Sequence, residues 1–207
     1  MARDRSPIVK QSRREGFALH VKAHKIMVKK SGIPGVHGNG GGRRNKPSLY
    51  SLQLREKQKV RRLYGLLEKQ FAKTMKEASR TKGKSGEVLL QLLERRLDNV
   101  VYRAGWAVSR RGSRQLTSHG HLMVNGVRVD VPSLRVKEGD VITVRPSSAK
   151  TQYFAKLNDI VKDTNQPTFS WLKSDPKKMT ITVTGLPMRS EADPDINEQL
   201  IVEYYSR

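Results

Sequence analysis

Three arginines, Arg110, Arg111 and Arg114, stand close together in the segment "SRRGSRQLTSHGHLMVNGVRV", residues 109–129. The guanidinium group is planar and can donate two parallel hydrogen bonds to the oxygens of a phosphate. No acidic residue lies between Arg103 and Arg128, so the segment itself offers these cations no counter-charge. A solvated helix face is the usual explanation of a run of surface charge, but uncompensated arginines favour phosphate as the partner.

A short helix is predicted to hold these arginines. Ser109 is suited to cap its N-terminus, and Gly120 is suited to end it. Residues three or four positions apart lie on the same face of a helix. The segment therefore presents two polar faces, one with Arg110 and Arg114 and the adjoining one with Arg111 and Gln115.

A tight hairpin is predicted directly after this helix. Asn125-Gly126 supplies the positive φ angles of a type I′ turn between the apolar runs 122–124 and 127–129. The second run contains Arg128. Because double-stranded RNA exposes mainly phosphates and 2′-hydroxyls, arginines fixed on such a frame are suited to binding structured RNA.

The overall composition also points to a polyanionic partner. The chain has 207 residues, of which 36% are hydrophobic, enough for a folded core. Lysine and arginine number 41 against 19 aspartates and glutamates, which gives a net charge of +22. No apolar run approaches the ~20 residues of a membrane span, which favours nucleic acid over a membrane. The absence of cysteine excludes disulfides and thiolate metal sites and, by default, indicates the cytoplasm.

The two ends of the chain differ in charge. Residues 1–50 contain twelve lysines and arginines against two acidic residues. Residues 190–207 contain five acidic residues against one arginine. We expect the acidic end to face a neighbouring basic protein.

The N-terminal quarter combines a predicted helix with an irregular connector. The run Ser12-Arg13-Arg14-Glu15 fits a capping box, which predicts that a short helix begins at Ser12. The glycine-rich stretch 31–47 predicts a basic connector. Within it, residues 35–38 match a G-x-x-G loop, the pattern that binds the RNA backbone in KH domains. The rest of a KH domain is not evident, so we predict the backbone contact but not that domain.

The remaining patterns predict an α+β protein. Apolar residues at three- and four-residue intervals predict one amphipathic helix over 48–80 and a second over 85–104. Two short strands are expected around residues 138–140. A helix over 151–163, a strand over 177–185 and a closing helix over 195–205 complete the prediction.

No arrangement of residues predicts catalysis, a metal or a cofactor. Gly83-Lys84-Ser85 imitates the end of a P-loop, but Ala78 stands where that motif needs a glycine. Two histidine pairs lack the further ligands of a zinc site, namely His20 with His24 and His119 with His121. Neither a carboxylate pair nor a nucleophile beside a base is evident. We therefore expect a binding protein that is not an enzyme.

One long segment has a recognisable pattern. "RLDNVVYRAGWAVSRRGSRQLTSHGHLMVNGVRV" resembles the RNA-binding module named after small ribosomal subunit protein number four. Its signature consists of Arg96-Leu97-Asp98, Ser109-Arg110, Arg114-Gln115-Leu116, His119-Gly120 and Val124-Asn125-Gly126. Four other stretches resemble the bacterial family of that protein. They are "SRREG" at 12–16, "PGVHG" at 34–38, "QLREKQKVRRLYGLLEKQF" at 53–71 and "DINEQLIVEYYS" at 195–206. Because the chain lacks cysteine, it is similar to the zinc-free branch.

The resemblance implies a helical domain with an inserted RNA-binding domain. A basic N-terminal extension would cover 1–42. The helical domain would comprise 43–94 and 187–207. The inserted RNA-binding domain, of short helices and a small curled antiparallel sheet, would cover 95–186.

The resemblance also implies a function. The chain would be a structural constituent of the small ribosomal subunit that binds a multi-helix ribosomal RNA junction early in assembly. Its partners would be neighbouring proteins, including small-subunit protein number five, and messenger RNA where it enters the ribosome. The module also occurs in RNA-modifying enzymes, so such an enzyme and a free RNA-binding translational regulator remain alternatives.

The implied RNA contacts are basic and polar side chains from several parts of the chain. They are Arg13, Arg14, Arg43, Arg44, Arg55, Lys57, Lys59, Arg61, Arg62, Arg110, Arg114, Gln115, His119 and Asn125, to which the charge of segment 109–129 adds Arg111 and Arg128. One departure is Gly112-Ser113, where relatives tend to carry a better helix former followed by alanine. Interior glycine costs about 1 kcal/mol relative to alanine, so the arginines beside it are expected to be held less firmly.

Overall fold

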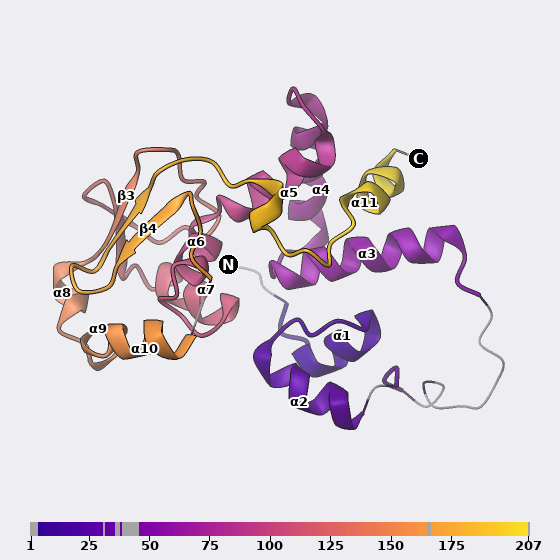
Figure 1. Ribbon diagram of the computed structural model, residues 1–207, viewed down its shortest axis with the longest axis horizontal. Helices are drawn as coiled ribbons and strands as arrows, with labels where there is room; N and C mark the ends of the chain where they lie inside the picture. Colours follow the sequence, from indigo (N-terminus) through magenta and orange to yellow (C-terminus); the bar gives the residue numbers. More distant parts are fainter. Residues whose placement is uncertain (1–3, 31, 36–37, 39–45, 165–166, 207) are drawn as a thin grey trace. The chain divides into compact units, whose positions relative to one another are not determined.

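The computed structural model describes residues 4–30, 32–35, 38, 46–164 and 167–206 (Figure 1). The chain forms two compact units. One combines the two ends of the chain, Met1–Leu89 and Asp195–Arg207, and the other is the continuous segment Leu90–Pro194. Helices build the first unit, and helices with a five-stranded antiparallel sheet build the second. The predicted α+β class is therefore confirmed.

In the first unit, α1 (Ile8–Glu15) and α2 (Val21–Lys29) pack against each other. The predicted capping box is wrong, because α1 begins at Ile8 and Ser12 lies inside it. The Ser12 hydroxyl is buried, donates to the carbonyl of Ile8 at 2.8 Å and accepts the amide of Leu19 at 3.2 Å. Ser12 thus joins α1 to the loop before α2 and does not begin a helix.

The helix predicted over 48–80 is two helices, α3 (Leu49–Leu63) and α4 (Glu68–Arg80). After α3, Gly65 has a φ of 65°, and the amide of Leu66 bonds back to the carbonyl of Arg61 at 2.9 Å. Leu66 is 1% exposed, so the chain turns without interrupting its series of buried apolar residues. Because that series runs across the turn, periodicity alone does not reveal the break.

The C-terminal helix α11 (Glu198–Tyr205) confirms the predicted closing helix and packs along α3. The side-chain amide of Gln53 donates to Glu203 Oε2 at 2.9 Å, and the backbone amide of Asn197 donates to Glu56 Oε1 at 2.9 Å. The buried core of this unit includes Val60, Phe71 and Ile201. Both ends of the sequence therefore contribute to one core.

The helix predicted over 85–104 is also two helices, α5 (Ser85–Glu94) and α6 (Leu97–Arg103). Between them, Arg96 forms a β-bridge with Arg135, and the amide of Leu97 bonds to the carbonyl of Leu134 at 2.8 Å. The predicted short helix follows as α7 (Arg110–Ser118). As predicted, Ser109 caps it, since its hydroxyl accepts the amide of Gly112 at 3.1 Å.

The sheet of the second unit has the order β2-β1-β3-β5-β4, and every neighbouring pair is antiparallel. Its strands are β1 (Leu122–Val124), β2 (Val127–Val129), β3 (Val141–Val144), β4 (Leu172–Asp175) and β5 (Thr180–Val183). Asn125 and Gly126 have φ angles of 50° and 81°, which confirms the predicted turn. Of the two strands predicted around 138–140, only β3 forms, because the segment before it bridges to Arg96.

Three short helices follow β3, and the last two of them replace the single helix predicted over 151–163. They are α8 (Pro146–Ala149), α9 (Gln152–Ala155) and α10 (Leu157–Thr164). Phe154 and Leu157, each 1% exposed, belong to the same hydrophobic core as Trp106, Ile142 and Ile181. Leu116 of α7 packs against that core, which gives α7 a rigid support.

Candidate nucleic-acid interface

One side of α7 faces solvent. Arg111, Gln115 and His119 follow one another at four-residue intervals and are exposed. Residues so spaced lie along one line of a helix. A guanidinium, an amide and an imidazole are therefore presented together by an element whose opposite side is anchored on the core.

Arg128, on β2, lies beside the end of this line. Its guanidinium occupies the space that a Cβ atom at Gly120 would need, with Nε 2.6 Å from the position of that atom. Gly120 has a φ of 67°, a conformation that favours glycine. The missing side chain lets exposed Arg128 close against the end of α7. We call Arg111, Gln115, His119 and Arg128 the outer face.

The other two arginines of α7 are held by the protein itself. Arg114 Nη1 lies 3.2 Å from Oδ2 of Asp98, and 12% of the Arg114 side chain is exposed. Asp98, in the first turn of α6, also accepts hydrogen bonds from Arg96 at 3.1 and 2.9 Å. One buried carboxylate therefore holds two guanidinium groups.

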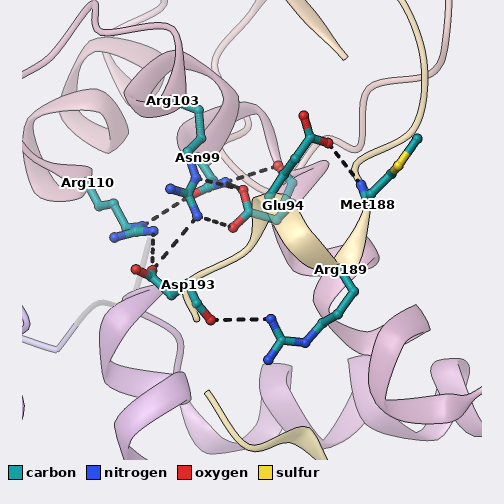
Figure 2. Close-up of polar contacts among 8 residues, drawn as sticks. Glu94, Asn99, Arg103, Arg110, Met188, Arg189 and Asp193 are labelled. Atoms are coloured by element: carbon teal, nitrogen blue, oxygen red, sulfur yellow. Dashed lines mark hydrogen bonds and ion pairs between the residues drawn. The ribbon is translucent and has the colours of Figure 1, made fainter. Parts of the chain in front are cut away.

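The partners of Arg110 include Asn99 and Asp193 (Figure 2). Its Nε donates to Asn99 Oδ1 at 3.0 Å, and its Nη2 lies 3.4 Å from Asp193 Oδ2. The guanidinium also lies 4.6 Å from the ring centroid of Tyr102, a cation–π contact. Partners outside α7 thus hold the side chains at both ends of segment 110–114.

These contacts correct the interpretation of segment 103–128 as uncompensated. Its counter-charges come from elsewhere in the sequence: Asp98 holds Arg114, Glu94 holds Arg103, and Asp193 holds Arg110 from 83 residues away. Asp98 belongs to the family signature. Glu94, Asn99 and Asp193 carry no such signal, because a window along the sequence registers only nearby charges.

Asn125 closes the hairpin onto β3. Its Nδ2 donates to Asp140 Oδ1 at 2.9 Å, and its Oδ1 accepts the amide of Val141 at 2.9 Å. The residue is exposed, but both polar atoms of its side chain already have partners. The structure gives Asn125 a role in the turn, and its contact with RNA stays a prediction.

In the first unit, Arg55 and Arg62 converge on Glu15. Arg55 Nη1 lies 3.2 Å from Glu15 Oε1, and Arg62 pairs with the same oxygen. The Glu15 side chain is fully buried, and burial raises its pKa against the opposing effect of the arginines. Burial likewise lowers the pKa of Arg62. Two predicted RNA contacts thus also join α3 to α1.

Lys57 lies inside the first unit, with 3% of the residue exposed. Its Nζ donates to Glu68 Oε1 at 2.9 Å and lies 4.6 Å from the ring centroid of Tyr204. Glu68 also accepts the hydroxyl of Tyr205 at 2.8 Å. Lys57 therefore links α3 to α4 and α11, and this fold leaves it almost no surface for the predicted RNA contact.

The other predicted contacts of this unit are less enclosed. Three donate hydrogen bonds within it: Lys59 to the carbonyl of Asp195 at 2.6 Å, Arg61 to Gln58 at 2.8 Å, and Arg13 to the carbonyl of Gly32 at 2.9 Å. Lys59 also forms an ion pair with Glu56 at 2.8 Å. Arg14 is exposed. Arg43 and Arg44 lie outside the described residues, as do two of the four residues of the G-x-x-G loop.

Across the described ranges, no group of three or more histidines and acidic residues is placed to hold a metal ion. The rings of His119 and His121 are 5.9 Å apart, and His121 Nδ1 lies 2.9 Å from Ser148 Oγ. Burial lowers the pKa of His121, and the charges of His119 and Arg145 add to this effect. None of the helices in the described part of the chain is long and apolar enough to cross a membrane.

Comparisons with known proteins match the whole length of the chain. Residues 3–94 match the family described as Ribosomal protein S4/S9 N-terminal domain, and residues 95–142 match the S4 domain. Small ribosomal subunit protein uS4 of Herpetosiphon aurantiacus is 50% identical over 212 residues, covering 100% of both chains. The proteins named uS4A of Symbiobacterium thermophilum and uS4 of Chloroflexus aurantiacus are 47% and 48% identical, again over 100% of both chains.

Proposed function

The chain belongs to the uS4 family of small ribosomal subunit proteins, and on this premise we propose that it stabilises a multi-helix junction of small-subunit ribosomal RNA during assembly. Membership confirms the family predicted from the sequence. The chain is accordingly a structural, RNA-binding constituent of the small subunit and not an enzyme. The junction itself is the new element of the proposal.

The outer face of α7 and β2 carries the proposal. It presents two exposed guanidinium groups, of Arg111 and Arg128. The helix α7, which carries Arg111, is fixed by packing on the hydrophobic core and by the ion pairs of Arg110 and Arg114. Structured RNA offers phosphates at spacings set by its folding, and fixed donors can distinguish one spacing from another. The net charge of +22 adds attraction to any RNA. The outer face therefore supplies shape preference on top of that attraction.

We propose that both units contact RNA, because predicted cationic contacts occur in each. The proposed organisation remains an RNA-binding domain, 95–186, inserted into a helical domain, 43–94 and 187–207, after an extension over 1–42. Two observations bear on it: the compact units part at Leu90 and Pro194, and α1 packs on α3. They support an insertion and favour placing the start of the chain with the helical domain.

We also propose contacts with neighbouring small-subunit proteins, including protein number five, and with messenger RNA where it enters the cytoplasmic ribosome. The acidic C-terminal end gives this less support than its composition suggests. Asp193 pairs with Arg110, and Glu203 accepts a hydrogen bond from Gln53. Two of its acids thus already serve the fold.

The proposal is tested by measuring affinity for the ribosomal RNA junction and for an unrelated structured RNA of equal length across a salt series. If phosphate neutralisation alone governs binding, added salt weakens the affinity for both RNAs with a similar slope. We expect the preference for the junction to persist at high salt. Equal affinities throughout would contradict shape recognition and leave a nonspecific polycation. Co-sedimentation with small subunits distinguishes a ribosomal constituent from a free regulator.

A further inference from the structure

A buried ion pair lies behind α7 in the second unit (Figure 2). Arg103 donates from Nε and Nη2 to the two carboxylate oxygens of Glu94, at 2.9 and 2.6 Å. The side chains are 8% and 2% exposed. Asn99 Nδ2 donates to Glu94 Oε2 at 2.6 Å and, through its Oδ1, accepts Arg110 Nε. The hydrogen bonds to Glu94 are therefore short, and the side chains of Arg103 and Glu94 are almost completely buried.

Asp193 is held more loosely at the edge of the same network. Its Oδ2 lies 3.4 Å from Arg110 Nη2 and 3.8 Å from Arg103 Nη2, and 28% of its side chain is exposed. Charge-assisted hydrogen bonds between nitrogen and oxygen are ordinarily about 2.7–2.9 Å long. The network therefore has a fixed inner carboxylate, Glu94, and a weakly bound outer one.

The segment that carries Asp193 is anchored without this ion pair. It follows the 3₁₀ turn η2 (Arg189–Glu191), where Glu191 Oε2 accepts the amide of Met188 at 3.1 Å and Oε1 accepts that of Ser170 at 2.7 Å. The carbonyl of Asp193 accepts Arg189 Nη1 at 3.4 Å. The Asp193 carboxylate can thus swing outward by side-chain rotation while its backbone stays in place.

Asp193 also balances the charge of the network. Two guanidinium groups, of Arg103 and Arg110, face two carboxylates, of Glu94 and Asp193. Moving Asp193 away removes one negative charge from beside two guanidinium groups that point at one place. A phosphate oxygen has the charge and the hydrogen-bonding capacity to fill that place.

We infer that Arg103 and Arg110 form a phosphate subsite, that the Asp193 carboxylate occupies it in the free protein, and that an RNA backbone phosphate replaces this carboxylate on binding. The inference rests on the proposed function, because it places the subsite behind the RNA-binding helix. It adds Arg103, which is not among the RNA contacts predicted from the sequence. It also makes Asp193 an internal competitor of RNA.

The first test compares Asp193→Asn with the matched variant Asp159→Asn, which removes the same charge from an exposed position on α10. RNA affinity is measured across a salt series for both variants and the wild type. We expect the slope of log affinity against log salt to steepen by about 1 in Asp193→Asn alone, because the phosphate is then neutralised without freeing a carboxylate that takes up a cation in its place. Adding Arg110→Gln should restore the wild-type slope. Equal slopes in both variants would overturn the inference.

The second test needs no RNA, so it separates failure of the subsite from failure of the proposed function. Inorganic phosphate is added to each protein, with chloride at equal ionic strength as the control, and the thermal transition is recorded. A ligand that binds only the folded state raises that transition. We expect phosphate to stabilise Asp193→Asn more than Asp159→Asn. Phosphate stabilisation with an unchanged RNA slope would indicate a site for free anions and overturn the RNA assignment.

The wild-type chain supplies a third test that does not depend on folding of a variant. The side-chain Nη–H signals of Arg103 and Arg110, the groups that face Asp193, are followed by NMR as RNA is added, with Arg96 as the internal control because Asp98 holds it. We expect the first two signals to shift and that of Arg96 to stay. Unchanged signals for Arg103 and Arg110 in the bound state would contradict the exchange.

Discussion

At the scale of single residues, the acids behind α7 decide what each arginine does. Arg111 faces solvent, where it can meet a phosphate. Arg114 meets the buried Asp98 and stiffens the helix beneath the outer face. The two residues are three positions apart and chemically identical, so the difference in their roles follows from the exposure of Arg111 and the burial of Arg114 against Asp98.

This difference predicts opposite effects of two similar substitutions. Arg111→Gln should weaken RNA binding and reduce its salt slope by about 1, with little change in thermal stability. Arg114→Gln should lower the free energy of unfolding by about 1 kcal/mol, because Asp98 keeps only Arg96 as its partner. Filter binding and thermal denaturation measure the two effects. The same profile from both variants would refute the division of roles.

The buried pair of Glu94 with Arg103 should be worth far more than a surface pair. Glu94→Gln leaves a buried guanidinium without its carboxylate, which should cost about 3 kcal/mol. On the same helix, Glu87 pairs with Lys84 at 3.2 Å, with side chains 46% and 83% exposed. Glu87→Gln should cost less than about 1 kcal/mol.

Urea unfolding followed by far-UV circular dichroism measures this contrast, since helices of both units contribute to that signal. Losses of similar size in the two variants would show that burial adds nothing to the Glu94 pair.

At the scale of elements, predictions succeeded where a few adjacent residues determine the structure. The Ser109 cap and the Asn125-Gly126 turn are of this kind, and both formed as predicted. The breaks at Gly65 and Arg96 were missed, because distant partners or a continuing apolar series decide them. The site divides in the same way: residue types indicate RNA, but only the fold shows which cations Glu15, Asp98 and Asp193 hold.

Two glycines at the ends of α7 should respond oppositely to alanine. At Gly112 a Cβ would meet Ser109 Oγ at 3.4 Å and the Ala107 side chain at 3.7 Å, both ordinary contacts. Gly112→Ala should therefore raise the free energy of unfolding by about 0.5–1 kcal/mol. Gly120→Ala should lower it, because φ is 67° and the Cβ would lie 2.6 Å from Arg128 Nε.

RNA affinity separates the two variants further. Gly120→Ala should weaken binding by displacing Arg128 from the outer face, whereas Gly112→Ala should preserve binding. Undiminished affinity of Gly120→Ala would show that the position of Arg128 does not matter to RNA.

At the scale of the whole molecule, many acidic residues are engaged inside the units. Glu15, Glu68, Glu94, Asp98 and Asp193 each hold at least one lysine or arginine. The cations outnumber the acids, so the excess of +22 must be borne by the folded chain. Such an excess favours solubility and RNA encounter but opposes compaction through self-repulsion.

Salt should therefore act in opposite directions on the free chain and on the complex. Raising sodium chloride from about 0.05 M to about 0.5 M should increase the thermal transition temperature of the free protein, because repulsion between exposed charges is screened more than buried pairs are. The same change should weaken RNA binding. Thermal scans across this range provide the measurement, and a transition temperature that falls with salt would show that ion pairs outweigh the repulsion.

The shared core of α3, α4 and α11 sets an order of events during biosynthesis. Ile201 completes a core that Val60 and Phe71 begin, so the first unit can complete this core only after residue 201 has been synthesised. The segment Leu90–Pro194 has all of its residues once Pro194 has been synthesised. The residues of the sheet and the outer face are thus all synthesised before the helix that completes the first unit. Until α11 is in place, the side of α3 on which it packs lacks that partner.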